Sequence, residues 1–582
     1  RNPAGSRFKL KTHRRVALRS SSALDCAEVA EPSMAEPNAS PPIASAARFA
    51  QPLPADLEPV APAETARVLA LDATALLQEM EQGKLTSAQI TSVYIRRART
   101  EGEKLNATTE ECFEEALAAA KASDVRRKAS GGGAVDGRPL EGLPVSLKDC
   151  FDQKGFDSTV GIVARQGRPL AEDGLFVKVL REAGAIPFVR SNVPPLLMGG
   201  GETENNVYGR TLNPWDLSRA PGSSSGGEGA LIAARGSPLG FGTDIGGSVR
   251  IPCAYSGIFG LKPTNGRIST QGLSLQEAPG QIAVLSCPGP MARSTDDLIL
   301  VCRVLLDARN PLWHAADGDP YMPPTPFDEA QLAAKQPLRI GFFECNGAFA
   351  PCATARRAVQ QAKARLEEQG HVLVPFTPPE VGEGAKLLGH LLRGDGGAWA
   401  LDALDGKEQP HRLIAWLVAS AQTSDGGQKP PAKLATELLA EVVGLQAHRG
   451  RFLAAWRAAR LDALLSPGLP IPAPRHQQSA VDARSYTMIY NVLGYPAGIV
   501  PETLVRPDEE EGYEGLDPAV QAPQQAALAA ETLKGAAGLP VAVQVAALPF
   551  RDETVLRVMK ALEVEGMKHS VPPTVSLQSW TK

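Results

Sequence analysis

The sequence predicts an α/β fold built around one large sheet. Residues 337–343 and 371–376 are short apolar runs, and residues 352–370 between them form a helical pattern that is closed by Gly370. Such a strand–helix–strand order is typical of strands joined by a crossover helix. A hydrophobic content of 43% and a charged content of 21% over 582 residues are those of a globular protein with a large core.

Helical patterns come first along the chain. Three of them follow one another over residues 72–83, 86–100 and 106–122. Asp72 is a capping residue for the first, and Gly83 ends it. A glycine-rich loop at residues 130–137 then leads to residues 142–147, a mostly apolar run that ends at Lys148. We expect this run to be a strand that places Lys148 at its end.

Two clusters rich in glycine and serine, residues 222–227 and 242–248, bracket a short apolar segment. Glycines this dense let the backbone adopt positive φ and let a substrate approach the main chain. Consecutive N–H groups in such turns converge into a nest for developing negative charge, and a serine at its end is placed for acyl transfer. A flexible linker is the alternative. The apolar residues 231–234 and 239–241 between the clusters favour burial instead.

These clusters and their flanks resemble the amidase signature family of Ser-Ser-Lys amide hydrolases, and within it the fatty acid amide hydrolase branch. The segments that carry the resemblance are GGEGALI, GSPLG, GTDIGGSVRIP and GIFGLKPTNGR, and the similarity extends over residues 143–562. It implies the amidase signature fold, in which one large mixed, twisted β-sheet is covered by helices on both faces. It also implies hydrolysis of a carboxylic amide through an acyl-enzyme, with no metal and no cofactor.

The resemblance assigns Lys148 as the base, Ser224 as the proton relay and Ser248 as the nucleophile. Ser223 and Ser225 are alternatives for the relay, because the family's usual GGSSGG reads GSSSGG here. The substrate-binding residues implied in the same way are Met198, Ser224, Ile245, Gly246, Gly247 and Ser248. The amides of the last four would hold the oxyanion.

Lys148 also has a simpler interpretation, an ion pair with the adjacent Asp149. The surrounding pattern favours catalysis, because all eight histidines lie far from the two clusters in the sequence and none belongs to a His–Ser or His–Asp motif. A desolvated lysine is the family's alternative base. Burial disfavours the ammonium form and lowers the pKa towards neutrality.

Residues 191–201 resemble the family segment whose methionine, here Met198, lines the substrate site. A methionine that fills a gap in the core is the alternative. The aromatic residues that follow this methionine in the family are replaced by Gly199 and Gly200, which alters the acyl-binding wall. Residues 413–445 occupy roughly the region of the branch's membrane-associating cap. Both a monotopic anchor and a plain pair of surface helices fit that region.

The predicted function is hydrolysis of fatty acid amides such as N-acylethanolamines, with esterase side activity. A general amidase or an amidotransferase-type amidase subunit is the alternative enzyme, and a pseudo-amidase scaffold is the alternative without activity. A net charge of −4 argues against a nucleic-acid partner, and the lack of a CxxC motif gives a zinc site little support. The expected partners are a small amide substrate of lipid character, a membrane in peripheral contact, and a second copy, since the resemblance implies a homodimer.

Three parts of the chain are expected: a disordered or targeting-like segment, a single amidase domain and a tail, over residues 1–66, 67–572 and 573–582. The domain would contain a helical start, a catalytic core and a C-terminal part of the same sheet, over residues 67–125, 140–300 and 335–565. Residues 1–24 are basic and contain no acid, which permits a transit peptide as well as a disordered tail.

No apolar run reaches the roughly 20 residues that a membrane-spanning helix needs. The eight cysteines are scattered, as free thiols in a reducing compartment would be. The expected location is therefore intracellular, in the cytoplasm or peripheral on an internal membrane.

Overall fold

A computed structural model describes residues 47–274, 282–307, 309–314, 318–418, 434–478 and 481–575, which all belong to one compact unit. The targeting-like residues 1–24 and most of the C-terminal tail lie outside the described residues. A 3₁₀ helix at Ala47–Ala50 and helix α1 at Pro62–Ala70 begin ahead of residue 67. Order therefore extends into the segment expected to be disordered, and the division of the chain into three parts stays a prediction.

The next two helices begin within a residue of the predicted starts. Helix α2 (Ala73–Glu81) starts after Asp72, whose carboxylate accepts a 2.9 Å hydrogen bond from a backbone amide of the first turn. Helix α3 (Ser87–Leu105) starts with a capping box between Thr86 and Gln89. Both helices are thus confirmed, and α3 runs five residues further than the pattern indicated.

The third predicted helix, over residues 106–122, is wrong at its start. Asn106 ends α3 in the left-handed region with φ 51°. Thr108–Glu111 then form strand β1, antiparallel to β3 (Ile186–Ser191), and helix α4 spans Phe113–Ala129. The reversal at Asn106 and the free edge of β3 decide the local structure here, because pairing along a sheet edge outweighs a short helical pattern.

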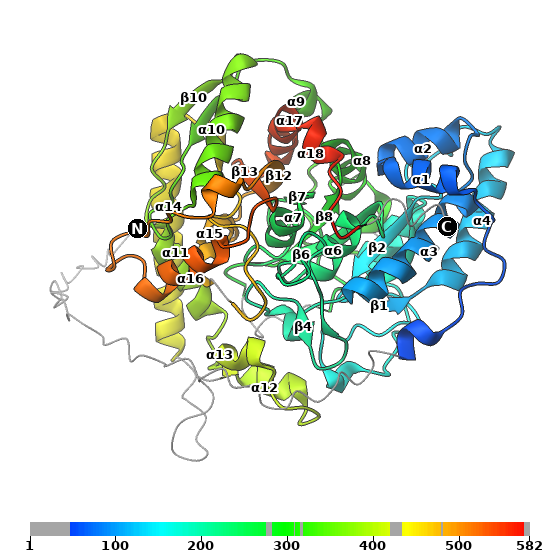
Figure 1. Cartoon of the computed structure of the whole chain (residues 1–582), viewed down its shortest axis with the longest axis horizontal. Helices are drawn as coiled ribbons and strands as arrows, with labels where there is room; N and C mark the ends of the chain where they lie inside the picture. The colour runs from blue at the N-terminus through cyan, green and yellow to red at the C-terminus, as the bar shows by residue number, and fades with distance from the viewer. Residues whose placement is uncertain are drawn as a thin grey trace, which may run out of the picture. The chain divides into compact units, whose positions relative to one another are not determined.

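The described strands form one mixed sheet of eleven, in the order β1-β3-β2-β6-β8-β7-β12-β13-β11-β9-β10 (Figure 1). Strands β3, β2 and β6 are parallel to one another, as are β11, β9 and β10, and the strands between these two groups pair antiparallel. The remaining strands of the sheet are β2 (Pro144–Lys148), β6 (Leu239–Asp244), β7 (Phe259–Lys262), β8 (Cys287–Ala292), β9 (Arg339–Phe342), β10 (Val372–Pro375), β11 (Ala463–Pro467), β12 (Ala497–Leu504) and β13 (Pro540–Ala546). A separate short ribbon pairs β4 (Glu204–Asn205) with β5 (Gly209–Arg210).

Helices cover both faces of this sheet, as the α/β prediction requires (Figure 1). They are α5 (Leu175–Glu182), α6 (Gly226–Ala233), α7 (Arg250–Ser256), α8 (Thr295–Leu305), α9 (Glu329–Ala333), α10 (Ala353–Glu368), α11 (Val381–Leu391), α12 (Ala398–Leu404), α13 (Ala415–Val418), α14 (Ala435–Ala459), α15 (Ser485–Leu493), α16 (Pro523–Leu533), α17 (Asp552–Leu562) and α18 (Glu565–Lys568). The predicted strand–helix–strand unit is confirmed as β9, α10 and β10, with β9 and β10 parallel.

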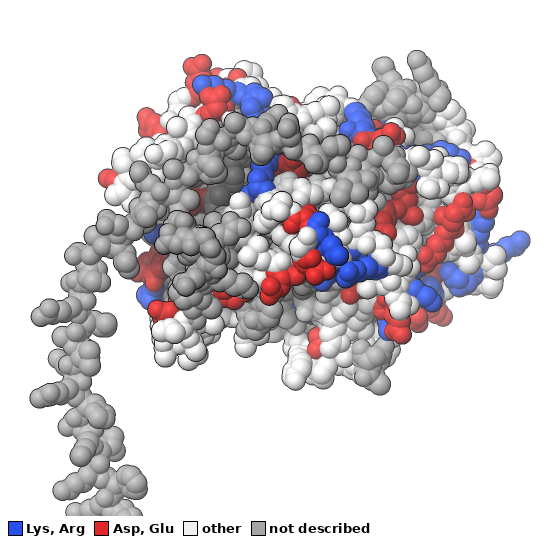
Figure 2. Space-filling model, turned by 90° about the horizontal axis from the view of Figure 1, so that it is seen from below, with Lys and Arg blue, Asp and Glu red and all other residues white. Residues whose placement is uncertain are grey.

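The region compared with a membrane cap contains α13 and α14, and residues 419–433 between them lie outside the described residues. No helix in the described ranges is both long enough and apolar enough to cross a bilayer. On the face drawn in Figure 2, acidic and basic side chains lie interspersed rather than gathered by sign.

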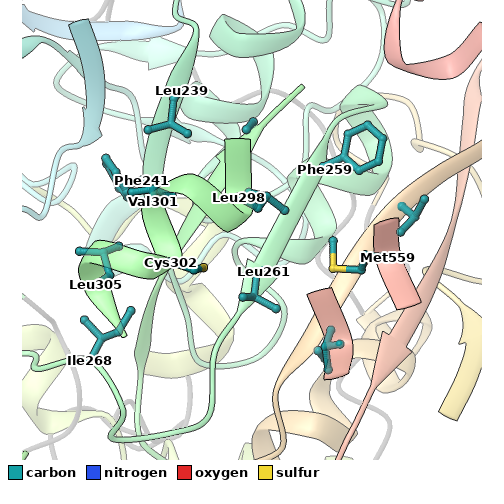
Figure 3. Packing of buried hydrophobic residues seen from close by; sticks show 14 of the residues in the cluster. Leu239, Phe241, Phe259, Leu261, Ile268, Leu298, Val301, Cys302, Leu305 and Met559 are labelled. Carbon is teal, nitrogen blue, oxygen red and sulfur yellow. The ribbon is translucent and has the colours of Figure 1, made fainter. Parts of the chain in front are cut away.

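Helix α8 packs against one face of the middle of the sheet. Figure 3 shows Leu298, Val301 and Leu305 of α8 close to Phe241 of β6 and Leu261 of β7. All five side chains are fully buried. Burial of such a side chain contributes roughly 1.5–3 kcal/mol. This burial stabilises the position of β6, and the second glycine cluster begins within the last residues of that strand.

Candidate active site

The site lies where two neighbouring parallel strands end. Strand β2 pairs with β6 in parallel, with Ser146 opposite Gly240. The carboxyl ends of both strands consequently meet at one edge of the sheet, and Lys148 and Asp244 are their last residues. The second glycine cluster runs from the end of β6 to α7, and the first one immediately precedes α6. Local topology thus brings Lys148 and both clusters to the same edge of the sheet, and Figure 1 shows β2, β6, α6 and α7 near one another in the molecule.

Lys148 is fully buried and donates hydrogen bonds to two hydroxyl groups. Its Nζ lies 2.7 Å from Ser224 Oγ and 2.7 Å from Thr243 Oγ1. Burial lowers the pKa of Lys148 to about 8, although Cys150 and nearby carboxylates oppose the shift. The amine therefore loses its proton more readily than an exposed lysine does.

The alternative of an ion pair between Lys148 and Asp149 is wrong. Adjacent residues at the end of a strand point to opposite sides. Asp149 accepts hydrogen bonds from Arg190 Nη2 at 3.2 Å and from the amide of Val160 at 3.1 Å. Its carboxylate forms its ion pair with Arg190. Within the described part of the chain Lys148 has no carboxylate partner, and its close contacts are hydroxyl groups.

Of the three candidate relay serines, Ser224 is the one that reaches Lys148. Ser224 is 2% exposed, and its peptide bond with Ser223 is cis. Ser223 Oγ instead accepts a 2.8 Å hydrogen bond from the amide of Gly201. Ser225 Oγ packs against Gly242, where a Cβ would lie only 2.4 Å from it. The geometry therefore separates three serines that the sequence leaves adjacent.

Ser248 lies beside the serine loop and is partly exposed. The amide of Ser225 donates to the carbonyl of Ser248 at 3.1 Å, so the two clusters are joined through their backbones. Among the described residues Ser248 Oγ makes no hydrogen bond, and none links it to Ser224 Oγ. The structure thus brings Lys148 and Ser224 into contact and leaves the Ser248 hydroxyl open to an incoming group.

The nest before Ser248 is held open by glycine. Gly247 has φ 123°, and a Cβ there would lie 2.3 Å from Thr487 Oγ1. Thr487 Oγ1 donates to the carbonyl of Gly246 at 3.0 Å, which turns that carbonyl away from the amides of the nest. Ile245 and Gly246 are both partly exposed. Helix α15 therefore supports the loop from behind and leaves its outer side accessible.

A buried ion pair that sequence reasoning missed holds the base of this nest. Asp244 accepts from the amide of Gly247 at 2.7 Å and from Arg250 Nε at 2.9 Å. Arg250 Nη2 and Nη1 also donate to Asn491 and Gln544. Burial alone would raise the pKa of Asp244, but the charge and hydrogen bonds of Arg250 hold it well below its usual value. The sequence offers one signal for this pair, an aspartate and an arginine that lie six residues apart on either side of a glycine turn.

A second missed residue, Glu228, connects α6 to β2. Glu228 is fully buried, and its Oε2 accepts a 2.5 Å hydrogen bond from Ser146 Oγ, two residues before Lys148. A Cβ at Gly240 would lie 2.0 Å from the same oxygen, so only glycine fits there. Burial raises the pKa of Glu228 to about 7. The contact fixes the helix that follows Ser224 against the strand that carries Lys148.

Met198 follows a short 3₁₀ helix, Pro195–Leu197, and is 8% exposed within the main hydrophobic core. Its chain segment borders the serine loop, because Gly201 donates to Ser223 and Thr203 Oγ1 donates to the carbonyl of Gly222 at 2.8 Å. Most of its surface is packed in the core, as the alternative interpretation holds. Its role toward a substrate stays a prediction.

Comparisons with known proteins agree with this geometry. The family model described as Amidase matches residues 89–556. Fatty-acid amide hydrolase 1 of Sus scrofa is 37% identical over 529 residues, which cover 85% of this chain and 86% of that protein. Fatty acid amide hydrolase 1 of Caenorhabditis elegans is 34% identical over 518 residues, which cover 85% of this chain and 88% of that protein. A solved structure of a fatty acid amide hydrolase matches with a TM-score of 0.76 at 26% identity and covers 88% of this chain and 87% of that one.

The fold, the serine and glycine clusters and these matches define an enzyme that hydrolyses amides. The chain belongs to the amidase signature family. It is similar to fatty acid amide hydrolases over most of its length.

Proposed function

We propose that this amidase hydrolyses fatty acid amides, such as N-acylethanolamines, by a Ser-Ser-Lys mechanism. The observation that carries the mechanism is the 2.7 Å contact between Ser224 Oγ and the Nζ of Lys148, a buried amine with a lowered pKa. A neutral lysine beside a buried serine hydroxyl has the donor and acceptor arrangement that a proton relay needs.

The proposed reaction begins with the neutral Lys148 amine. Lys148 accepts the Ser224 proton while Ser224 accepts the proton of Ser248, whose Oγ attacks the amide carbon. The relay then returns the proton to the departing amine, and the acyl group stays on Ser248 as an ester. Water activated through the same relay hydrolyses that ester and releases the acid. No residue outside this trio has to exchange a proton.

The oxyanion of each tetrahedral intermediate needs amide donors. We assign this role to the amides of Ile245, Gly246 and Ser248. The amide of Gly247, the remaining donor expected from the sequence, donates to Asp244 at 2.7 Å and thereby shapes the nest. Donors fixed in place before the reaction stabilise the developing charge without reorganisation.

The lipid character of the substrate is supported by apolar side chains near the nest. A methyl group on Gly246 would lie 3.7 Å from Met488 Cγ and 3.9 Å from Leu388 Cδ2, and Ile245 is partly exposed beside them. Fatty acid amides are also what the names of the animal relatives describe. An acyl chain that binds along these residues gains transfer free energy with every methylene that it buries.

A series of primary amides graded by acyl length tests the substrate class. We expect kcat/KM to rise about fourfold per added methylene until the apolar surface is filled, which corresponds to about 0.8 kcal/mol per buried CH₂. A general amidase would show a flat or falling series, and an amidotransferase-type subunit would prefer glutamine. The series must include short-chain amides as a control, because an acetamidase of Aspergillus oryzae is also 30% identical over 84% of this chain. A pseudo-amidase would neither turn over any amide nor react with a fluorophosphonate probe.

We also propose peripheral membrane contact through α14. Leu439 and Val443 lie four residues apart on one side of this helix and are 64% and 68% exposed. The double variant Leu439→Ser, Val443→Ser should bind phosphatidylcholine vesicles at least about tenfold more weakly, since each side chain contributes roughly 1.5 kcal/mol or more when it is buried in lipid. Val125→Ser, at an equally exposed valine of α4, is the matched control and should co-sediment like the wild type. Equal binding of all three proteins would refute the contact.

Two further features rest on the family resemblance. We propose a homodimer, which light scattering on the purified protein measures directly. We also propose an intracellular location, supported by the free thiols of the seven described cysteines.

A further inference from the structure

Helices α11 and α14 meet at a buried histidine that the proposed mechanism does not use. His448 of α14 is fully buried, and within the described residues neither of its ring nitrogens has a hydrogen-bond partner. Its Nε2 lies against Gly384 of α11, where a Cβ would be 2.8 Å away. A buried imidazole loses its hydrogen bonds to water, and this loss costs free energy unless other groups bind its ring nitrogens. Buried polar side chains therefore usually have a partner, and His448 has none among the described residues.

Two carboxylates converge on the same place. Glu380 and Glu383, at the start of α11, are both exposed, and one oxygen of each lies within 4.8 Å of a His448 ring nitrogen and of the other carboxylate. Arg451 Nη2 lies 2.6 Å from Glu380 and 3.0 Å from Glu383. Two carboxylates this close repel each other unless a cation lies between them. In this structure that cation is the guanidinium of Arg451, whose side chain is partly exposed.

We propose that Glu380, Glu383 and His448 form a binding site for a divalent transition-metal ion, with Zn²⁺ as the best match. One imidazole nitrogen and two carboxylate oxygens are donors that Zn²⁺ accepts in tetrahedral sites, with water as the fourth ligand. Ca²⁺ and Mg²⁺ prefer all-oxygen sites and fit less well. Arg451 has to swing aside when the metal binds, which its exposed position allows.

The site lies on the helix that contributes Leu388 to the apolar side chains near the nest. Leu388, which faces Gly246, is on α11 one to two turns beyond Glu383. A metal would link the first turn of α11 to α14 and thereby restrain the helix that carries Leu388. His448 lies more than 60 residues after the two glutamates in the sequence, so no short metal-binding motif could have indicated the whole set.

The test is a Zn²⁺ titration of chelator-treated protein in competition with a chromophoric chelator. We expect one equivalent to bind. Glu383→Gln should weaken binding by about 10- to 100-fold or more, because loss of a ligand costs at least as much as loss of a residue that orients one. Arg451→Gln should strengthen binding about fivefold, because it removes a unit charge close to the ion. Glu531→Gln, at an exposed carboxylate paired with Lys534, is the matched control and should bind like the wild type.

Co²⁺ substitution identifies the ligands. Tetrahedral oxygen and nitrogen ligands should produce d–d bands without the thiolate charge-transfer band that a site at the partly buried Cys345 would produce. His448→Gln should lose these bands, with thermal denaturation as the check on its folding. Absence of a bound equivalent, a thiolate band, or Glu383→Gln and Arg451→Gln variants that both bind like the wild type would each overturn the proposal.

Discussion

Replacing Ser248 with alanine is expected to lower kcat for amides by about 10⁶-fold, the scale on which loss of a catalytic serine acts. The reason is geometric. Ser248 is the serine whose hydroxyl is partly exposed at the end of the glycine nest, whereas Ser224 and Ser225 are buried. Covalent labelling by a fluorophosphonate, followed by mass spectrometry of the modified peptide, measures the effect independently of turnover.

The Ser248→Ala variant should unfold at the wild-type temperature, because the lost hydroxyl makes no hydrogen bond to any described residue. Ser223→Ala serves as the comparison. It removes only the contact with Gly201 and should still be labelled at Ser248. If Ser248→Ala is labelled on another serine and still turns over substrate, the nucleophile has been assigned to the wrong residue.

Replacing Lys148 with alanine should lower amide turnover by about 10⁴-fold and ester turnover by much less. An amine leaving group must be protonated as it departs, whereas an alkoxide is less demanding, so loss of the proton relay penalises amides more. The wild-type kcat/KM should rise with pH and level off above about 8. Below the pKa of about 8 the amine is an ammonium ion and accepts no proton, and above that pKa it is neutral. Parallel amide and ester rates across pH on both proteins give the measurement.

The chain contains a close control for this experiment. Lys262, at the end of β7, is also fully buried, and burial lowers its pKa to about 8 as well. Its Nζ donates to the carbonyl of Pro263 and to Asn265 rather than to a serine. Lys262→Ala should reduce stability and leave the amide-to-ester ratio and the pH profile unchanged. A Lys148→Ala variant that behaves in the same way would exclude the lysine as the base.

Much of the fold follows from local patterns. The unit β9–α10–β10 was predictable because apolar runs, a helical period and Gly370 all lie within forty residues. The cap at Asp72 was predictable for the same reason. Strand β1 was not, since its structure depends on pairing with β3, about eighty residues away.

The candidate site divides in the same way. The resemblance singled out Lys148 and Ser224, and the structure places them in contact. It could not indicate that Glu228 joins α6 to β2, nor that Arg250 reaches Asn491 and Gln544, because these contacts form only after distant strands have come together. Buried polar networks depend on three-dimensional proximity, and the sequence alone does not show it.

The bond between Arg250 and Gln544 has a consequence for how the enzyme is made. Its two ends are 294 residues apart, and Gln544 belongs to the last strand of the sheet. During synthesis the ribosome releases Lys148, Ser224 and Ser248 long before it releases β13. Until then the guanidinium that neutralises Asp244 lacks part of its support, and contacts between such distant segments form late in folding. We therefore expect the support of this loop to be completed only after β13 has left the ribosome.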